Sequence, residues 1–263
     1  MLPRFPALAL AAIASCRSGA TSVAEARADE PIGADGGAAV VELFTSEGCS
    51  SCPPADDVLA ALVESSDRRI YPLAFHVDYW DELGWPDRFA SRAYTARQQA
   101  YSRAFGVSGV YTPQMVVGGT EQFTGSDRGR ADAALARALS HPAKVRLSIQ
   151  SRSVSQDAAT VDYTVSEVPA GVVFNVAVVE RRATTSVRSG ENAGKTLQHA
   201  NVVVGFASVP LTAPSGSVMV HFPPSLSRDH AELTGFVQRE TLVAGMPVLG
   251  AARAPLAAVA IER

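Results

Sequence analysis

The stretch VVELFTSEGCSSCPP, residues 40–54, is the most informative part of the sequence for predicting the fold. Its first five residues are apolar except for Glu42 and predict a short buried strand. Cys49 and Cys52 follow with C-x-x-C spacing, and two prolines then open a helical pattern. A cysteine pair at a helix N-terminus is typical of a redox-active dithiol, because the helix dipole lowers the pKa of the first thiol.

Helical and strand patterns alternate outward from this stretch as far as residue 142. Apolar spacing predicts a β-α-β-α-β-β-α order, over Val40–Phe44, Pro53–Glu64, Ile70–Val77, Phe89–Phe105, Gln114–Val117, Glu121–Thr124 and Asp127–Leu139. Alternation of strands and helices predicts a parallel core with right-handed crossovers, and the final pair of strands adds an antiparallel edge.

The pattern changes after Lys144 to short strands in which apolar and polar residues alternate. We expect strands near 145–149, 161–165, 172–179, 202–206, 218–222 and 233–238. Glycine, proline and serine separate them, as is typical of a β-sandwich. This segment therefore predicts a sandwich-like C-terminal domain over residues 143–263.

The N-terminus has the pattern of an export signal over residues 1–28, with Arg4 before a short apolar run. Residues 29–38 predict a flexible leader. Cys16 either lies by chance in a discarded peptide or ends a lipobox, in which case it would be acylated and anchor the protein. Both interpretations predict an exported protein, periplasmic or secreted, in a compartment where disulfides persist.

Composition excludes some classes of function. Of the residues 47% are hydrophobic and 19% charged, and the net charge of −3 includes no basic cluster, so we expect no binding to nucleic acid. Contact with a membrane is expected only through lipidation of Cys16. No cofactor is expected.

Several longer stretches resemble a bacterial family of exported thioredoxin-like proteins that is catalogued only as a domain of unknown function. The similar stretches are residues 41–56, FHVDYWD at 75–81, YTPQMVV at 111–117, GEN at 190–192 and HANVV at 199–203. The resemblance implies an α/β thioredoxin-like domain over residues 39–142, followed by the all-β, sandwich-like domain. It also implies that Thr112-Pro113 is a cis-proline loop facing the cysteines.

By position, Cys49 is expected to be the exposed, attacking thiol and Cys52 the buried, resolving thiol. A structural disulfide is the first alternative. A metal site is the second, although four ligands are usual and no further C-x-x-C or H-x-x-x-H exists. Two departures from ordinary thioredoxins are Gly48, where an aromatic residue is usual, and the prolines that directly follow Cys52.

Four other side chains are candidate accessories to this chemistry. His76, Asp78 and Trp80 fall at the carboxyl end of the second strand, at the edge that borders the cysteines. His76 is interpreted as an acid or base, a metal ligand, or a hydrogen-bonded core histidine. Glu42 is either a proton carrier for Cys52 or a paired structural carboxylate. Its position predicts a side chain on the opposite face of the strand from the one that a proton carrier needs, unless the turn before Cys49 is one residue longer.

The C-terminal segment contains a polar group whose members either order a loop or form a binding site: Glu191, Asn192, His199 and Asn201. The sequence as a whole predicts a thiol–disulfide oxidoreductase acting on protein or small-molecule thiols. One alternative is copper binding through Cys49, Cys52 and His76. The other is a non-catalytic binding module in which the cysteines sense redox state.

Overall fold

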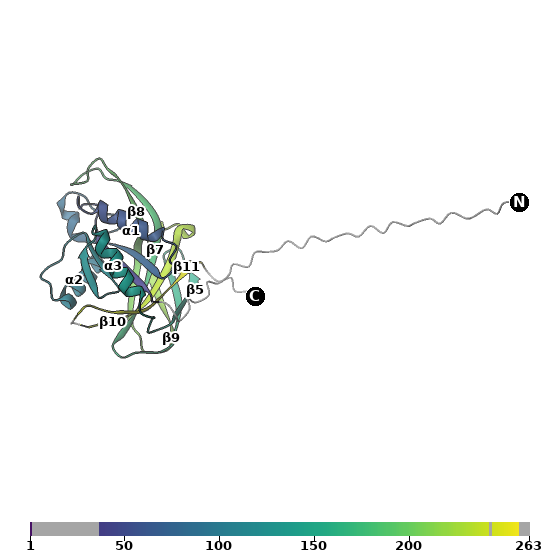
Figure 1. Ribbon diagram of the computed structural model, residues 1–263. Coiled ribbons are helices and arrows are strands. Elements are labelled where there is room, and N and C mark those ends of the chain that lie inside the picture. The colour runs from purple at the N-terminus through teal and green to yellow at the C-terminus, as the bar shows by residue number, and fades with distance from the viewer. Residues whose placement is uncertain (2–36, 242–243, 258–263) are drawn as a thin grey trace.

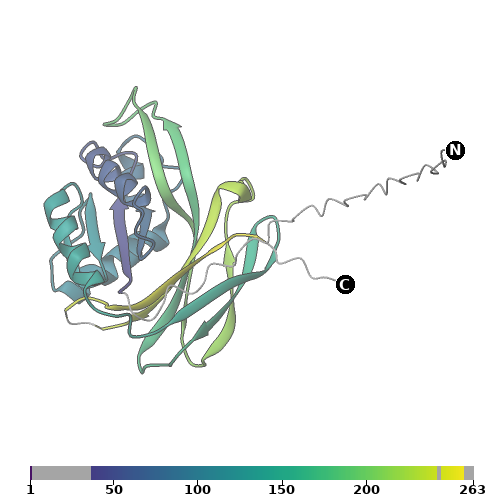
Figure 2. The same ribbon diagram turned by 45° about the vertical axis from the view of Figure 1, so that its right-hand side comes forward.

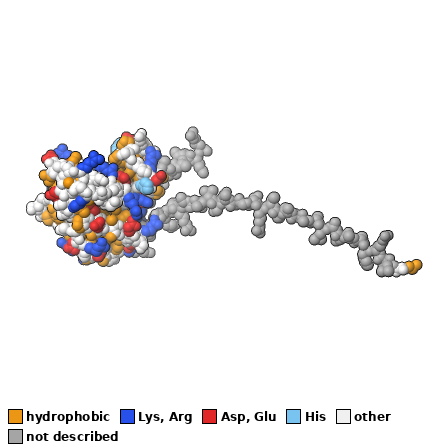
Figure 3. Space-filling view, turned by 90° about the horizontal axis from the view of Figure 1, so that it is seen from above, with side chains coloured by type: hydrophobic (Ala, Val, Ile, Leu, Met, Phe, Trp, Pro, Cys, Tyr) orange, Lys and Arg blue, Asp and Glu red, His pale blue; other side chains and the backbone are white. Residues whose placement is uncertain are grey.

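The computed structural model describes residue 1 and residues 37–241 and 244–257 (Figure 1). Apart from residue 1, the predicted signal peptide, with Cys16, lies outside the described residues, as does nearly all of the predicted leader. Within the described ranges, no helix is long and apolar enough to cross a membrane. On the face seen in Figure 3, acidic and basic side chains are interspersed.

The first part of the chain has the predicted order of elements, with one added 3₁₀ helix, η1. The elements are β1 (Ala39–Thr45), α1 (Pro53–Val63), β2 (Ile70–His76), η1 (Asp78–Leu83), α2 (Arg92–Phe105), β3 (Gln114–Val117), β4 (Glu121–Thr124) and α3 (Arg128–Leu139). Helix α2 begins three residues later than predicted, because Ser91 caps it by accepting a hydrogen bond from the Ala93 amide at 3.2 Å.

The second part is almost entirely strand. It contains β5 (Leu147–Val154), β6 (Ala158–Val165), β7 (Val172–Ser186), β8 (Thr196–Pro210), β9 (Ser215–His221), the short 3₁₀ helix η2 (Arg228–His230), β10 (Ala231–Arg239) and β11 (Val248–Pro255). The β11 strand was not predicted. Strands β7 and β8 are 15 residues each, far longer than predicted.

The prediction of an α/β thioredoxin-like domain followed by a separate all-β domain is wrong. The chain is mostly β, and one mixed eight-stranded sheet runs through both parts in the order β11-β10-β7-β8-β2-β1-β3-β4. The two parts join where β2 pairs with β8 in parallel, at Ala74 and Val202. Long-range pairing of this kind leaves no pattern in either strand taken alone, which is why the sequence did not reveal it.

A shared core reinforces this single sheet. Strand β1 alternates its side chains, so that Val41 and Leu43 pack with α1 and α3, whereas Val40 and Phe44 face α2. The same core includes residues of β7, β8 and β10, namely Ala177, Val179, Val203 and Phe236. The first part of the chain therefore buries one of its faces against the second.

Strands β5, β6 and β9 form a separate three-stranded sheet that packs on the β7, β10 and β11 end of the large sheet (Figure 2). The β7–β8 hairpin extends past this sandwich and rises beside α1 (Figure 2). Its turn, residues 187–195, is called the hairpin tip below. The length of the two strands brings a turn from the second part of the chain to the cysteine pair.

Candidate functional site

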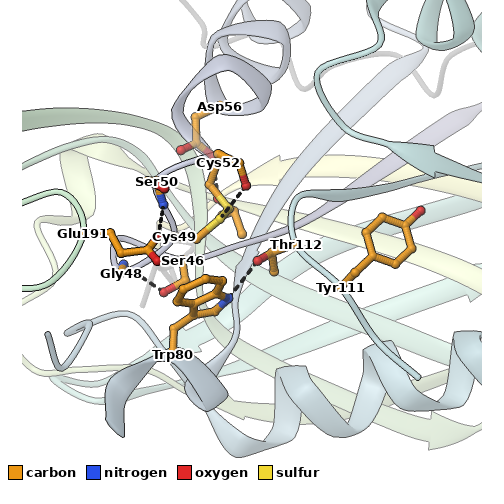
Figure 4. The surroundings of a disulfide bond; sticks show 12 residues. Ser46, Gly48, Cys49, Ser50, Cys52, Asp56, Trp80, Tyr111, Thr112 and Glu191 are labelled. Atoms are coloured by element: carbon orange, nitrogen blue, oxygen red, sulfur yellow. Dashed lines mark hydrogen bonds between the residues drawn. A yellow bond between two sulfur atoms is a disulfide. The ribbon is translucent and has the colours of Figure 1, made fainter. Parts of the chain in front are cut away.

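Cys49 and Cys52 form a disulfide, with Cα atoms 5.4 Å apart, in the turn between β1 and α1 (Figure 4). This turn, residues 46–52, is called the disulfide loop. Its backbone is closed by hydrogen bonds from the Cys49 amide to the Ser46 carbonyl and from the Cys52 amide to the Cys49 carbonyl, both 3.2 Å. The C-x-x-C spacing thus places both sulfurs at the start of a helix.

Helix α1 begins directly after the second cysteine. Cys52 is its N-cap residue, and the two prolines occupy its first positions, where a missing amide hydrogen costs no intrahelical bond. The Cys52 carbonyl accepts from the Ala55 and Asp56 amides at 2.8 and 3.1 Å. The prolines therefore fix where the helix starts and do not disrupt it.

Both cysteines are 0% exposed, so the expectation of an exposed Cys49 is wrong for the disulfide-bonded state. The two serines between them are exposed and form the outer surface of the loop. A thiol that attacks this disulfide must therefore wait for the covering residues to move. Sequence position could not reveal this, because part of the cover comes from residues more than 140 positions away.

The Thr112-Pro113 bond is cis, which confirms that prediction. Thr112 lies beside the disulfide and accepts a hydrogen bond from the Trp80 indole at 2.8 Å (Figure 4). Trp80 also packs on the loop, since a Cβ on Gly48 would lie 3.2 Å from the Trp80 Cβ. Gly48 therefore makes room for an aromatic side chain supplied by η1, in place of one in the loop itself.

A buried polar cluster lies beneath the disulfide loop and consists of Glu47, His76, Asp87 and His199. His76 Nδ1 and Asp87 Oδ2 are 2.7 Å apart, and His199 Nε2 and Glu47 Oε1 are 3.2 Å apart. The two imidazoles meet edge to face with centroids 5.0 Å apart. Since all four side chains are buried, each charge is held by another member of the cluster or by a backbone amide.

Charge pairing controls the ionisation of this polar cluster. Burial disfavours the charged forms, but the attraction between His76 and Asp87 raises the pKa of His76 above 6.5 and lowers that of Asp87 to about 2. Burial likewise opposes ionisation of Glu47, yet hydrogen bonding, chiefly from His199, lowers its pKa. His76 Nε2 is buried and has no hydrogen-bond partner among the described residues. The pairing with Asp87 therefore favours the protonated form of His76.

Asp56 connects this polar cluster to the disulfide. It lies one helical turn after Cys52 (Figure 4). Its carboxylate accepts from the Thr45 hydroxyl at 2.9 Å. Burial raises the pKa of Asp56 to about 6, although the nearby His199 and His76 charges oppose the shift. A carboxyl that titrates near neutrality next to a cysteine is suited to proton transfer.

Glu42 lies on the other face of β1, away from the disulfide, as the alternation of side chains predicts. It accepts from Arg97 Nε at 2.5 Å and Nη2 at 2.9 Å, and also from the Tyr101 hydroxyl. Arg97 Nη2 also donates a hydrogen bond to Oε1 of Gln238, in β10, at 2.9 Å. The structure therefore assigns Glu42 to a buried ion pair that joins β1, α2 and β10.

Asp78 is the first residue of η1 and accepts a hydrogen bond from the Thr95 hydroxyl at 2.5 Å, which connects η1 to α2.

In the described part of the chain, no three histidine, cysteine or acidic residues are grouped so that they could hold a metal ion. Cys49 and Cys52 are joined by a disulfide, and His76 is hydrogen-bonded to Asp87. The geometry therefore gives the copper alternative no support.

The hairpin tip covers the disulfide loop. Asn192 is 0% exposed and donates from Nδ2 to the Glu47 and Cys49 carbonyls, both at 2.9 Å. The exposed Glu191 accepts from the Ser50 amide at 3.0 Å. The sequence analysis left open whether these residues order a loop or form a binding site. In the structure they contact the loop that contains the cysteines.

Four residues of this site were not identified as functional from the sequence: Glu47, Asp56, Trp85 and Asp87. Two had a local signal. Glu47 is an acid two residues before Cys49, and Asp56 is on the same helix face as Cys52. Trp85 and Asp87 contact Glu47 from a loop some 40 residues later, so only the fold reveals their role.

The described residues define a class of protein: a mixed β-sheet protein in which a C-x-x-C disulfide lies over a buried acid–histidine cluster. The chain belongs to the family described as "Protein of unknown function (DUF1223)", whose model matches residues 40–238. This confirms membership of a domain family of unknown function.

Two solved structures are similar to the chain. The crystal structure of protein AGR_C_4864 from Agrobacterium tumefaciens is 29% identical, with 86% of this chain and 97% of that chain covered and a TM-score of 0.60. A β-glucosidase from Kluyveromyces marxianus in complex with glucose is 13% identical over 48% of this chain and 16% of that chain, and its TM-score of 0.20 indicates no shared fold. A comparison with curated proteins found no match.

Proposed function

We propose that the protein is a thiol–disulfide oxidoreductase that uses the Cys49–Cys52 pair. The observation that carries the proposal is a disulfide at a helix N-terminus, beside the cis-proline loop and next to a carboxyl with a pKa of about 6. A structural disulfide requires neither a nearby proton carrier nor a helix dipole aimed at its sulfurs.

The proposed reaction transfers two electrons and two protons. A substrate thiolate attacks Cys49 Sγ, the Cys49–Cys52 bond breaks, and Cys52 leaves as a thiolate. A second substrate thiolate then attacks the substrate sulfur of the mixed disulfide and releases Cys49. The substrate ends as a disulfide and the protein as a dithiol, and the reverse sequence reduces a substrate disulfide.

Asp56 is proposed as the proton carrier for Cys52. As Cys52 leaves, a protonated Asp56 supplies the proton that neutralises the thiolate; in the reverse direction the ionised carboxylate accepts it. Thr45 holds the carboxylate, and His76 and His199 lie close enough to influence its charge. Asp56 therefore takes the role of proton carrier that was considered for Glu42, because the Glu42 carboxylate is hydrogen-bonded to Arg97.

The test is the activity and reduction potential of the purified protein. We expect reduction of insulin, or oxidation of a dithiol, to be lost with Cys49→Ser and with Cys52→Ser. We also expect a potential between about −120 and −270 mV, the range of known oxidoreductases, whereas one below about −300 mV would indicate a structural disulfide. Ser215→Ala, at an exposed position on β9, is the control. A Cys49→Ser variant as active as the wild type would reject the proposal.

A redox-sensing binding module is the second candidate, and complete burial of both cysteines favours it. In that case reduction would loosen the disulfide loop and its contacts with the hairpin tip, without turnover. A partner that binds only one redox state, together with absence of catalytic exchange, would support this candidate over the first.

We further propose that the protein works outside the cytoplasm, as its N-terminal pattern predicts. A disulfide is stable there against the reducing systems of the cytosol. Cell fractionation and the mass of the mature N-terminus test this. Retention of residues 1–28 in a cytosolic protein would contradict it, and an acylated Cys16 would identify a lipid anchor.

A further inference from the structure

The Glu191 carboxylate accepts a hydrogen bond from a backbone amide in the disulfide loop. It accepts from the Ser50 amide at 3.0 Å, and Ser50 directly follows Cys49 (Figure 4). Hydrogen bonds from the Ser50 side chain and amide lower the pKa of Glu191, so it is ionised at neutral pH. A negative charge therefore lies at the backbone amide of the residue that directly follows Cys49.

The contact between Glu191 and the Ser50 amide has two effects, and both destabilise a Cys49 thiolate. A thiolate at a helix N-terminus is stabilised by the free backbone amides of the preceding turn, and Glu191 already engages one of them. The carboxylate also repels a thiolate through its charge. Both effects disfavour the reduced, ionised protein and leave the disulfide-bonded form unaffected.

The carboxylate is held in place by its neighbours in the hairpin tip. Asn192 anchors the tip to the Glu47 and Cys49 carbonyls, and the Ser189 hydroxyl donates to the Gly84 carbonyl at 2.5 Å. Gly190 packs closely on Trp85, where a Cβ would lie 3.1 Å from the Trp85 Cβ. Glu191 is therefore positioned on both sides by buried or packed residues.

We infer that the hairpin tip is part of the redox site, and that Glu191 is a positioning residue which lowers the reduction potential of the Cys49–Cys52 pair. The inference rests on the proposed function. It adds that Glu191 influences whether the pair reduces or oxidises its substrate. With Glu191 in place, the protein is a better reductant and a weaker oxidant than the C-x-x-C loop would be alone.

The test compares Glu191→Gln and Glu191→Ala in equilibrium with glutathione, where two glutathione thiols reduce the disulfide and leave one oxidised glutathione. Glutamine keeps an acceptor for the Ser50 amide and removes only the charge, whereas alanine removes both. We expect the equilibrium constant for reduction to rise about threefold with Gln, the size of one screened surface charge, and further with Ala. The thiolate pKa of Cys49 should fall in the same order.

The dependence on salt concentration distinguishes the effect of the Glu191 charge from the effect of its hydrogen bond to the Ser50 amide. Because salt screens exposed charges, the difference between Glu191→Gln and wild type should vanish near 1 M salt, whereas part of the alanine effect should persist. Glu167→Gln, an exposed site before the start of β7, is the matched control and should change nothing. Equal constants for wild type and both variants, or an equal shift with Glu167→Gln, would overturn the inference. A shift without turnover would reject the proposed function alone.

Discussion

At the scale of single residues, Asp56 carries the clearest pH dependence. Burial raises its pKa from 3.8 to about 6, so the folded protein favours the protonated carboxyl. The wild type should therefore lose stability as pH rises from about 4 to about 6, by about 2 kcal/mol after allowance for solvent contact. Asp56→Asn should remove this loss and be the more stable protein at pH 8, as thermal unfolding at a series of pH values would show.

Asp132→Asn is the control for this prediction, because Asp132 is an exposed carboxylate on a different helix, α3. It should leave the pH dependence of unfolding unchanged. If Asp56→Asn follows the wild-type curve across this range, Asp56 is not the titrating group, and its proposed role in proton transfer loses its basis.

The Glu42–Arg97 pair is the second residue-scale feature. Glu42 is 1% exposed, and Arg97 lies over the aromatic rings of Phe75, Tyr101, Phe206 and Phe236. Glu42→Ala leaves this guanidinium buried without its counterion and should cost about 3–5 kcal/mol in urea unfolding. The exposed pair of Glu121 and Arg137 provides a contrast, since Glu121→Ala should cost less than about 1 kcal/mol. Equal losses would mean that the Glu42 pair contributes no more than a surface contact.

At the scale of elements, the β7–β8 hairpin covers the disulfide loop, and we expect it to limit access to the disulfide. Asn192→Asp removes both hydrogen bonds to the Glu47 and Cys49 carbonyls and sets a carboxylate against them. Each lost bond is worth about 1 kcal/mol, so reduction by dithiothreitol should become at least about tenfold faster. Stopped-flow reduction measures this, with Thr196→Ala, at an exposed position of β8, as the control. An unchanged rate would show that the tip does not limit access.

At the scale of the whole molecule, the shared core makes the first part of the chain dependent on the second. Residues 37–142 alone would expose the face that packs on Ala177, Val179, Val203 and Phe236. Each large apolar side chain left uncovered costs about 1.5–3 kcal/mol, against a typical total stability of about 5–15 kcal/mol. We expect this fragment to lack dispersed side-chain signals in NMR, whereas residues 37–257 fold cooperatively. A cooperative unfolding transition of the fragment would show instead that the boundary near residue 142 separates two independent units.

The local features of the protein can be predicted from its sequence. Apolar spacing located β1 to α3, the C-x-x-C spacing located the disulfide, and alternation along β1 placed Glu42 on the face opposite the disulfide. The Thr112-Pro113 motif predicted its cis bond through a family resemblance. These features depend on residues that are near one another in the chain, so periodicity, proline and spacing are enough to predict them.

The surroundings of the disulfide, in contrast, depend on the tertiary packing of the chain. The pairing of β2 with β8 merges the two predicted domains into one sheet, and the hairpin tip brings Asn192 and Glu191 over Cys49. The same folding places His199 against Glu47 beneath the loop. These contacts join residues more than 120 positions apart, and the pattern of each segment constrains only its own conformation and buried face. Which faces meet is set by packing of the whole chain, and that packing buried a cysteine which the sequence alone predicted to be exposed.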